Sequence, residues 1–150
     1  DNILFGKLAY GQAQAQARVG EVIGEVVDSL ELRREVMRVG LGYEVGIAGG
    51  RLSFAQRQKL AIASALMKNP DVIIVNEATA SLDTTAEARV MENLLRHMKG
   101  RGVIWVVNRA RLARDFDNIF VMDGGKVVET GIFAELEKSG SVFGELLQTQ

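Results

Sequence analysis

The sequence predicts an α/β fold in which a helical section precedes a parallel sheet. Two short apolar runs, Val72–Val75 and Val103–Val107, are rich in β-branched residues and have the length of strands buried on both faces. A helical pattern, Thr84–Lys99, separates the two runs and stops at Gly100. Helical patterns also dominate the chain before the first strand, which adds a helical section in front of the α/β part.

Composition narrows the classes of protein that the chain can represent. Its 150 residues suffice for one domain, and 47% hydrophobic with 25% charged residues is typical of a globular chain. The net charge of -1 gives no basic field, so we expect no nucleic-acid partner. The absence of cysteine excludes disulfides and thiolate metal sites. The apolar runs are far shorter than the roughly 20 residues of a membrane span.

Two helices are predicted before the first strand. The first has apolar residues at helical spacing, which indicates one buried face; they are Val19, Val22, Ile23, Val26, Val27 and Leu30. The glycine-rich stretch Gly40–Gly50 predicts a loop. Ser53 and Gln56 have the spacing of a capping box, which predicts a helix start there. This helix should run to about Lys68, since Pro70 disfavours its continuation.

The C-terminal third predicts a hairpin and two short helices. Apolar residues at Ile119–Met122 and Val127–Val128 flank Asp123–Lys126, whose central glycines favour a two-residue turn. Helices are expected at Phe133–Lys138 and Val142–Gln148.

Three stretches resemble one family of ATPases. Arg51–Leu66 reads RLSFAQRQKLAIASAL, Val72–Asp83 reads VIIVNEATASLD, and Ile119–Gly131 reads IFVMDGGKVVETG. They are similar to the signature helix, the Walker B strand with its D-loop, and the terminal hairpin of ATP-binding cassette (ABC) transporter ATPases. Their order and spacing also match, and the resemblance covers nearly the whole chain.

Two further stretches resemble exporter-type members of this family. Tyr43–Gly50, YEVGIAGG, is similar to the loop that precedes the signature in exporters, whereas taken alone its glycines would indicate a flexible connector. The resemblance implies that Glu44–Gly49 contacts a transmembrane transporter domain. Asp1–Gly6 is similar to the segment that follows the Q-loop.

The resemblance implies a partial P-loop NTPase (RecA-like) parallel sheet with the ABC helical subdomain in front. Residues 1–68 would form the helical subdomain with the signature helix. Residues 69–150 would form the C-terminal part of the RecA-like catalytic core, with the Walker B strand, D-loop, switch loop, terminal hairpin and last helices.

The start of the signature helix is the first candidate site. Backbone N–H groups at a helix N-terminus can cradle a phosphate. The resemblance implies that this segment contacts ATP held by a second ABC ATPase domain, with Ser53 donating a hydrogen bond to the γ-phosphate. The residues of the segment are Leu52, Ser53, Phe54, Ala55 and Gln56. Phe54 and Ala55 replace two glycines that allow the backbone to come close to the phosphate. The phenyl ring of Phe54 either blocks this approach or turns aside. Ser53 also suits a plain helix cap.

The end of the first strand is the second candidate site. Glu77 stands where the family has the glutamate that polarises the attacking water, although it also suits a solvated strand end. Asn76 replaces the aspartate that supports magnesium, so we expect weak, water-mediated Mg binding. The D-loop residues would be Ser81, Leu82 and Asp83, of which Asp83 also suits a helix cap.

The chain differs from the family at the switch position and lacks the phosphate-binding loop. Asn108 stands where the family has a histidine; it can hydrogen-bond a phosphate but carries no charge. The only histidine, His97, ends a helix whose negative end would attract its charge, and we assign it no site. No G-x-x-x-x-G-K-[ST] loop is present, as Gly6-Lys7 and Gly125-Lys126 lack the next hydroxyl residue. Truncation explains this, and we expect the chain to be inactive alone.

Three functions remain open at this point. The first is a nucleotide-binding domain fragment of an ABC transporter, coupling ATP binding and hydrolysis to transport at the cytoplasmic face of a membrane. The second is a degenerate, non-hydrolysing regulatory half-site, favoured by the substitutions at the signature, Walker B and switch positions. The third is a non-transport ABC ATPase of DNA repair or chromosome structure, which the exporter-like loop disfavours.

Overall fold

The computed structural model describes residues 13–138 and 140–149. The chain divides into two compact units, Asp1–Trp105 and Val106–Gln150. The subdomain boundary expected after residue 68 stays a prediction. The segment Asp1–Gly6, which resembles the region after the Q-loop, lies outside the described residues.

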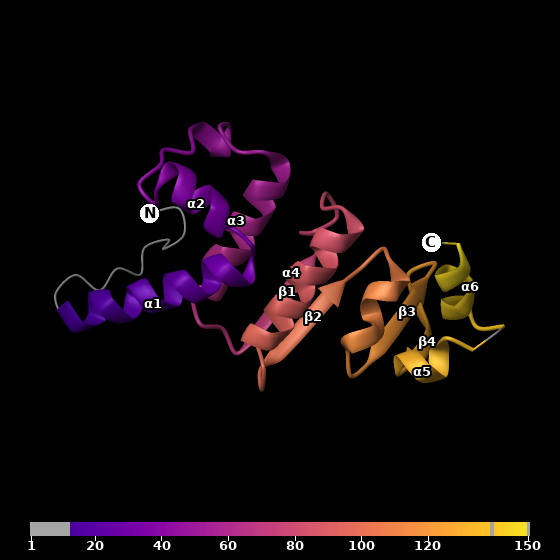
Figure 1. Ribbon diagram of the computed structural model, residues 1–150. Helices are drawn as coiled ribbons and strands as arrows, with labels where there is room; N and C mark the ends of the chain where they lie inside the picture. The colour runs from indigo at the N-terminus through magenta and orange to yellow at the C-terminus, as the bar shows by residue number, and fades with distance from the viewer. Residues whose placement is uncertain (1–12, 139, 150) are drawn as a thin grey trace. The chain divides into compact units, whose positions relative to one another are not determined.

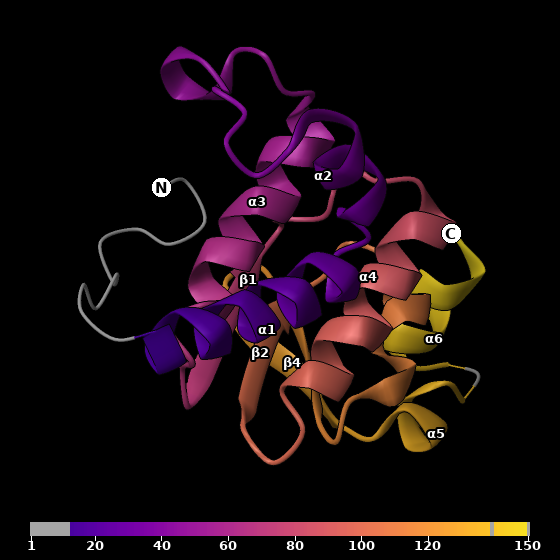
Figure 2. The same cartoon turned by 60° about the vertical axis from the view of Figure 1, so that its left-hand side comes forward.

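The first unit combines helices with a small parallel sheet (Figure 1). Its elements, in chain order, are α1 (Ala13–Ser29), α2 (Arg33–Val39), the 3-10 turn η1 (Ile47–Gly49), α3 (Phe54–Leu66), β1 (Val72–Asn76), α4 (Thr84–His97) and β2 (Gly102–Val106). Strands β1 and β2 pair with each other. Helix α1 contacts α2, α3 and α4, and Figure 2 shows α1 beside α4.

The core of the first unit lies between the helices and one face of the sheet. Its most buried members share aliphatic side chains with little or no exposed area, which are Val26, Leu30, Ile62, Leu66, Ile73, Val75, Val90, Leu94 and Met98. Val26 and Leu30 belong to the apolar stripe predicted for α1, so that amphipathic helix is confirmed.

The sheet is covered on one face only within the described residues, so the predicted burial of both faces is wrong. In β1, Ile73 and Val75 are buried, whereas Val72 and Ile74 are 55% and 66% exposed. In β2, Ile104 is 54% exposed while Trp105 packs against the core. The buried face packs in one cluster with residues of α1, α3 and α4. A run of apolar residues therefore forms a strand here without a second covering layer.

The second unit is a hairpin packed with short helices. Its elements are η2 (Ala110–Asp115), β3 (Ile119–Asp123), β4 (Lys126–Gly131), α5 (Phe133–Leu136) and α6 (Val142–Gln148). Gly124 and Gly125 both have positive φ, 52° and 76°, as the predicted two-residue turn requires. Within this unit's core, the rings of Phe133 and Phe143 pack edge to face, with their centroids 5.5 Å apart.

Three helical elements had no counterpart in the sequence-based prediction, and one of them, the 3-10 helix η1, lies within the predicted loop Gly40–Gly50. Helix α2 precedes the predicted glycine-rich loop, and Leu32 caps it without a side-chain hydrogen bond. The 3-10 helix η2 follows the β2 strand. Helices α3 and α4 end at Leu66 and His97, two residues earlier than predicted in each case.

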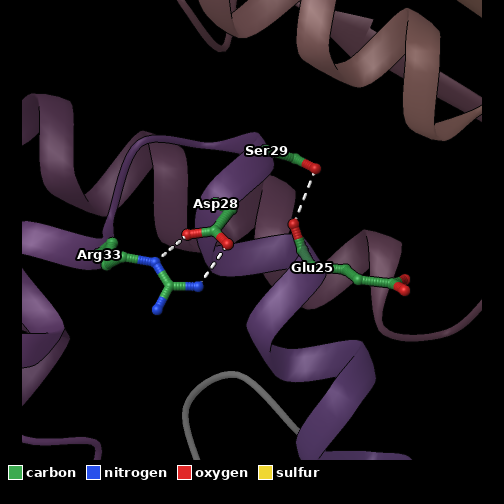
Figure 3. A network of polar contacts seen from close by, with 4 residues as sticks. All are labelled: Glu25, Asp28, Ser29 and Arg33. Atoms are coloured by element: carbon green, nitrogen blue, oxygen red, sulfur yellow. Dashed lines mark hydrogen bonds and ion pairs between the residues drawn. The ribbon is translucent and has the colours of Figure 1, made fainter.

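The corner between α1 and α2 is fixed by polar contacts (Figure 3). The guanidinium of Arg33 donates two hydrogen bonds to the Asp28 carboxylate, which lower the pKa of Asp28. Ser29 Oγ donates to the Glu25 carbonyl at 2.8 Å. Glu31 turns the chain with φ of 55°, and its carboxylate lies 2.8 Å from Arg89 Nε. The second ion pair of Glu31 is to Lys59 Nζ, at 3.8 Å.

Among the helices that the structure describes, none combines the length and the apolar character needed to cross a bilayer.

Candidate functional site

The start of α3 is held by the predicted capping box, which the structure confirms. Ser53 Oγ accepts from the Gln56 amide at 3.1 Å, and Gln56 Oε1 accepts from the Ser53 amide at 2.9 Å. This exchange fixes the first turn. Ser53 is exposed, and because its Oγ is the acceptor in this bond, its hydroxyl proton is available for donation outward.

Phe54 and Ala55 occupy different environments at this helix start. The Phe54 side chain is exposed, and the Arg57 guanidinium lies 5.7 Å from its ring centroid. This contact pairs the Phe54 ring with the Arg57 guanidinium, and whether the ring blocks the approach of a phosphate stays a prediction. Ala55 packs against the core, and the half-buried Leu52 donates its amide to the Gly49 carbonyl at 2.9 Å.

Glu77 directly follows β1 and has left-handed backbone geometry. Its φ of 51° is rare for a residue with a side chain. Asn76, the last residue of β1, and Glu77 are both exposed at the carboxyl end of the strand. The amide of Ala80 donates to the Glu77 carbonyl at 3.2 Å, and the amide of Leu82 donates to the Thr79 carbonyl at 2.9 Å. A tight turn thus begins at the candidate catalytic residue.

Gln58 joins the two candidate sites. Its Nε2 donates to the Glu77 carbonyl oxygen at 3.5 Å, and its Oε1 accepts from the Ser81 hydroxyl. The start of α3 and the turn after β1 are therefore linked through one side chain. Sequence reasoning missed Gln58, because nothing in the local pattern of α3 marks a contact with a segment 19 to 23 residues further along the chain.

The end of the turn is anchored on α4. Asp83 caps this helix by accepting from the Ala86 amide at 2.9 Å, which lowers the pKa of Asp83. Leu82 is buried in the core. Thr79 Oγ1 donates to Glu87 Oε1 at 2.7 Å in a buried position. Thr79 and Glu87 were not predicted, and their burial gives the D-loop segment a defined conformation.

The remaining candidates lie apart from this turn in the sequence. Asn108 is exposed, two residues after β2, and belongs to the second unit. In the loop Glu44–Gly49, Arg51 donates its amide to the Val45 carbonyl at 2.9 Å and its guanidinium to the Glu44 carbonyl at 3.3 Å. Ile47 at the tip is 97% exposed. The loop is thus tied back by Arg51 and presents an apolar tip.

The residues fit ATP and a water-mediated magnesium ion, which the family resemblance implies. At the start of α3, the exposed residue Ser53 places its hydroxyl at the N-terminus of a helix, a combination that can bind a phosphate. At the end of β1 the donor set is one carboxylate, Glu77, and one amide, Asn76. No cluster of three or more His, Asp or Glu residues in the described ranges is arranged for a metal. This set suits magnesium that keeps most of its waters rather than an all-protein cage.

Comparisons with known proteins find relatives among ABC transporters and flippases. No family model matches the chain. The ATP-dependent lipid A-core flippase of Xylella fastidiosa is 34% identical over 152 residues, covering 100% of this chain and 26% of the flippase. The ABC transporter BEA3 of Gibberella fujikuroi is 38% identical over 130 residues, covering 85% of this chain and 10% of the transporter.

A solved structure agrees with these relatives. The structure of a bacterial Atm1-family ABC exporter with ATP bound is 27% identical, with a TM-score of 0.81, and covers 99% of this chain and 25% of the exporter. The chain thus spans between 10% and 26% of the length of these proteins. It belongs to the ABC transporter family, as part of a nucleotide-binding domain.

Proposed function

We propose that the chain contributes two parts of the ATPase machinery of a membrane transporter. At the start of α3, Ser53 donates to the γ-phosphate of ATP held by a second ABC ATPase domain. At the end of β1, Glu77 orients the attacking water at the chain's own site. The observation that carries this proposal is that Ser53 and Glu77 are exposed on two elements that Gln58 connects.

Each group has a defined part in this proposal. Magnesium supplies charge neutralisation at the phosphates when it is bound. Asn76 accepts a hydrogen bond from a magnesium-bound water, and Asn108 hydrogen-bonds a phosphate without carrying charge. The amides of Phe54 and Ala55, which lie between the two amides engaged in the capping box, complete the phosphate contact.

The loop Glu44–Gly49 is the proposed contact with the transmembrane domain. Arg51 holds this loop, and Ile47 is presented at its tip. An exposed apolar side chain on a tied loop suits insertion into a partner protein. The chain would then act at the cytoplasmic face of a membrane, where ATP is available.

Four substitutions favour a second candidate, a regulatory half-site that binds nucleotide without hydrolysis. They are Phe54, Ala55, Asn76 and Asn108. Loss of a single positioned acid–base group costs about 10²–10⁴ in rate. Several such changes would therefore be enough to silence one site.

ATP turnover of the complete protein distinguishes the two candidates. If the first is right, Glu77→Gln lowers turnover about 10²-fold or more. The matched control is Glu92→Gln, which makes the same change at an exposed ion pair with Arg96 on α4. If this half-site is regulatory, Glu77→Gln leaves turnover unchanged, whereas Asn76→Asp with Asn108→His raises it. A wild-type rate in all of these variants would contradict both assignments.

A further inference from the structure

We propose that Gln58 is a positioning residue that couples the phosphate-facing start of α3 to the backbone of Glu77. This inference rests on the proposed function, because it concerns the same two sites. In this arrangement a displacement of α3 on contact with phosphate moves the turn that carries the water-orienting carboxylate.

The amide of Gln58 has a defined orientation because both of its ends are engaged. A backbone carbonyl can only accept hydrogen bonds, so the group that faces Glu77 O must be Nε2. The opposite end, Oε1, then meets the hydroxyl of Ser81. Gln58 thus contacts the first and the fifth residue of the 77–81 segment. It fixes the turn at two points rather than one.

The hydrogen bond from Gln58 is made to a residue with a rare backbone conformation, Glu77. Glu77 has a φ of 51°, a conformation that side-chain-bearing residues rarely adopt unless their surroundings hold them there. Its carbonyl accepts from the Ala80 amide at 3.2 Å and from Gln58 at 3.5 Å. Since the carbonyl orientation and the direction of the Glu77 side chain share one backbone conformation, Gln58 also helps to aim the carboxylate.

Helix α3 can transmit movement between Ser53 and Gln58. The two residues lie five positions apart, roughly 7.5 Å along a helix axis. The capping box with Gln56 makes Ser53 part of the same hydrogen-bonded helix. Further along, Ile62 and Leu66 are buried in the core, so α3 is anchored at its far end. A contact at Ser53 therefore acts on Gln58 through a continuous element.

The test uses the complete protein with Gln58→Met, which keeps the length of the side chain and removes both hydrogen bonds. The first readout is hydrogen exchange without nucleotide. We expect the Ala80 amide, which shares the Glu77 carbonyl, to exchange about two- to tenfold faster, as the loss of one hydrogen bond implies. The second is steady-state turnover. We expect kcat to fall by a similar factor and KM for ATP to stay within about twofold, because Gln58 does not touch ATP.

Two further variants keep the test decisive. Gln58→Glu retains Oε1 for Ser81 but replaces the donor that faces Glu77, so we expect faster Ala80 exchange again. Ser81→Ala removes only the other end of the link, and we expect a smaller acceleration. Ala61→Gln, at an exposed position of α3, is the matched control and should leave exchange and kcat unchanged.

Failure of this inference can be told apart from failure of the proposed function. If Glu77→Gln lowers turnover but Gln58→Met leaves Ala80 exchange and kcat at wild-type values, the coupling role is overturned and the proposed function stands. A rise in KM with unchanged kcat in Gln58→Met also overturns it. If Glu77→Gln has no effect on turnover, the proposed function fails, and accelerated Ala80 exchange in Gln58→Met still supports the structural link.

Discussion

At the scale of single residues, the predictable features are those that depend on neighbours in sequence. Ser53 and Gln56 lie three positions apart, so their capping box is visible in the sequence and is found in the structure. The link from Gln58 to Ser81 depends on how α3 lies beside the turn after β1, and no local pattern encodes that. The functional roles of Ser53 and Glu77 stay predictions.

His97, at the end of α4, has a pKa that its surroundings lower. The sequence suggested that its charged form would interact with the negative end of α4. In the structure, burial lowers the pKa of His97, with a further contribution from Arg101, while Glu25 of α1 opposes the shift. His97 lines an open polar pocket that also includes Asp28, Ser29, Asn93 and Arg96. The neutral ring is therefore the form that the fold favours.

A pH-dependent stability follows from this lowered pKa. The unfolded chain binds a proton at His97 below about pH 6.5, and the folded chain does so only at lower pH. Stability should therefore fall as pH drops from 7.5 through 6.5, and level off below the folded pKa. Urea unfolding of the chain at pH 7.5 and 5.5 measures this loss. The variant His97→Gln should lose less stability between pH 7.5 and 5.5. An equal loss in wild type and variant would show that His97 is not its cause.

At the scale of elements, the corner at Glu31 combines a strained backbone with two ion pairs. Its φ is 55°, and its carboxylate reaches Arg89 on α4 and Lys59 on α3. Partly exposed ion pairs contribute about 0–1 kcal/mol, whereas left-handed geometry costs a residue with a side chain about 1–2 kcal/mol. Backbone geometry should therefore decide the outcome of substitution at this position.

Two substitutions at position 31 separate these effects. Glu31→Ala loses the ion pairs and keeps the strain, so it should destabilise the chain. Glu31→Gly loses the same ion pairs but adopts positive φ without strain, and we expect it to be about 1 kcal/mol more stable than Glu31→Ala. Denaturant midpoints of both variants provide the measurement. A glycine variant less stable than the alanine variant would show that the turn is not strained.

The elements themselves were predicted with uneven success, for physical reasons. Helices α3 and α4 begin with side-chain caps at Ser53 and Asp83, so their starts are visible in the sequence. Helix α2 begins at Arg33 and has only seven residues, and the side chain of its N-cap residue, Leu32, forms no capping bond. The hairpin was clear because two consecutive glycines suit its turn. The start of α2 therefore left no capping signal in the sequence.

At the scale of the whole molecule, the sheet of the first unit carries three exposed apolar side chains, Val72, Ile74 and Ile104. These side chains are more than half exposed. Apolar composition predicted the strands but not which faces are covered, because coverage depends on the elements that pack there. Exposed apolar strands favour association between chains.

Substitution of Ile74 tests this consequence for association. Ile74→Lys should raise the concentration at which the 150-residue chain stays monomeric, with little change in its unfolding midpoint. Light scattering across a concentration series gives the first quantity, and denaturant unfolding gives the second. Ile73→Lys, one position away and only 6% exposed, should instead unfold the chain. Equal destabilisation by both changes would mean that Ile74 is buried as well.

The backbone of Glu77 has a consequence for how such a position evolves. Glycine and asparagine adopt positive φ more readily than glutamate does. Selection for heat tolerance alone would therefore move position 77 away from glutamate, even though no contact elsewhere in the fold improves. If Glu77 orients the attacking water as proposed, selection on the chemistry of the carboxylate would retain the acid, and heat tolerance and catalysis would then oppose each other at this residue.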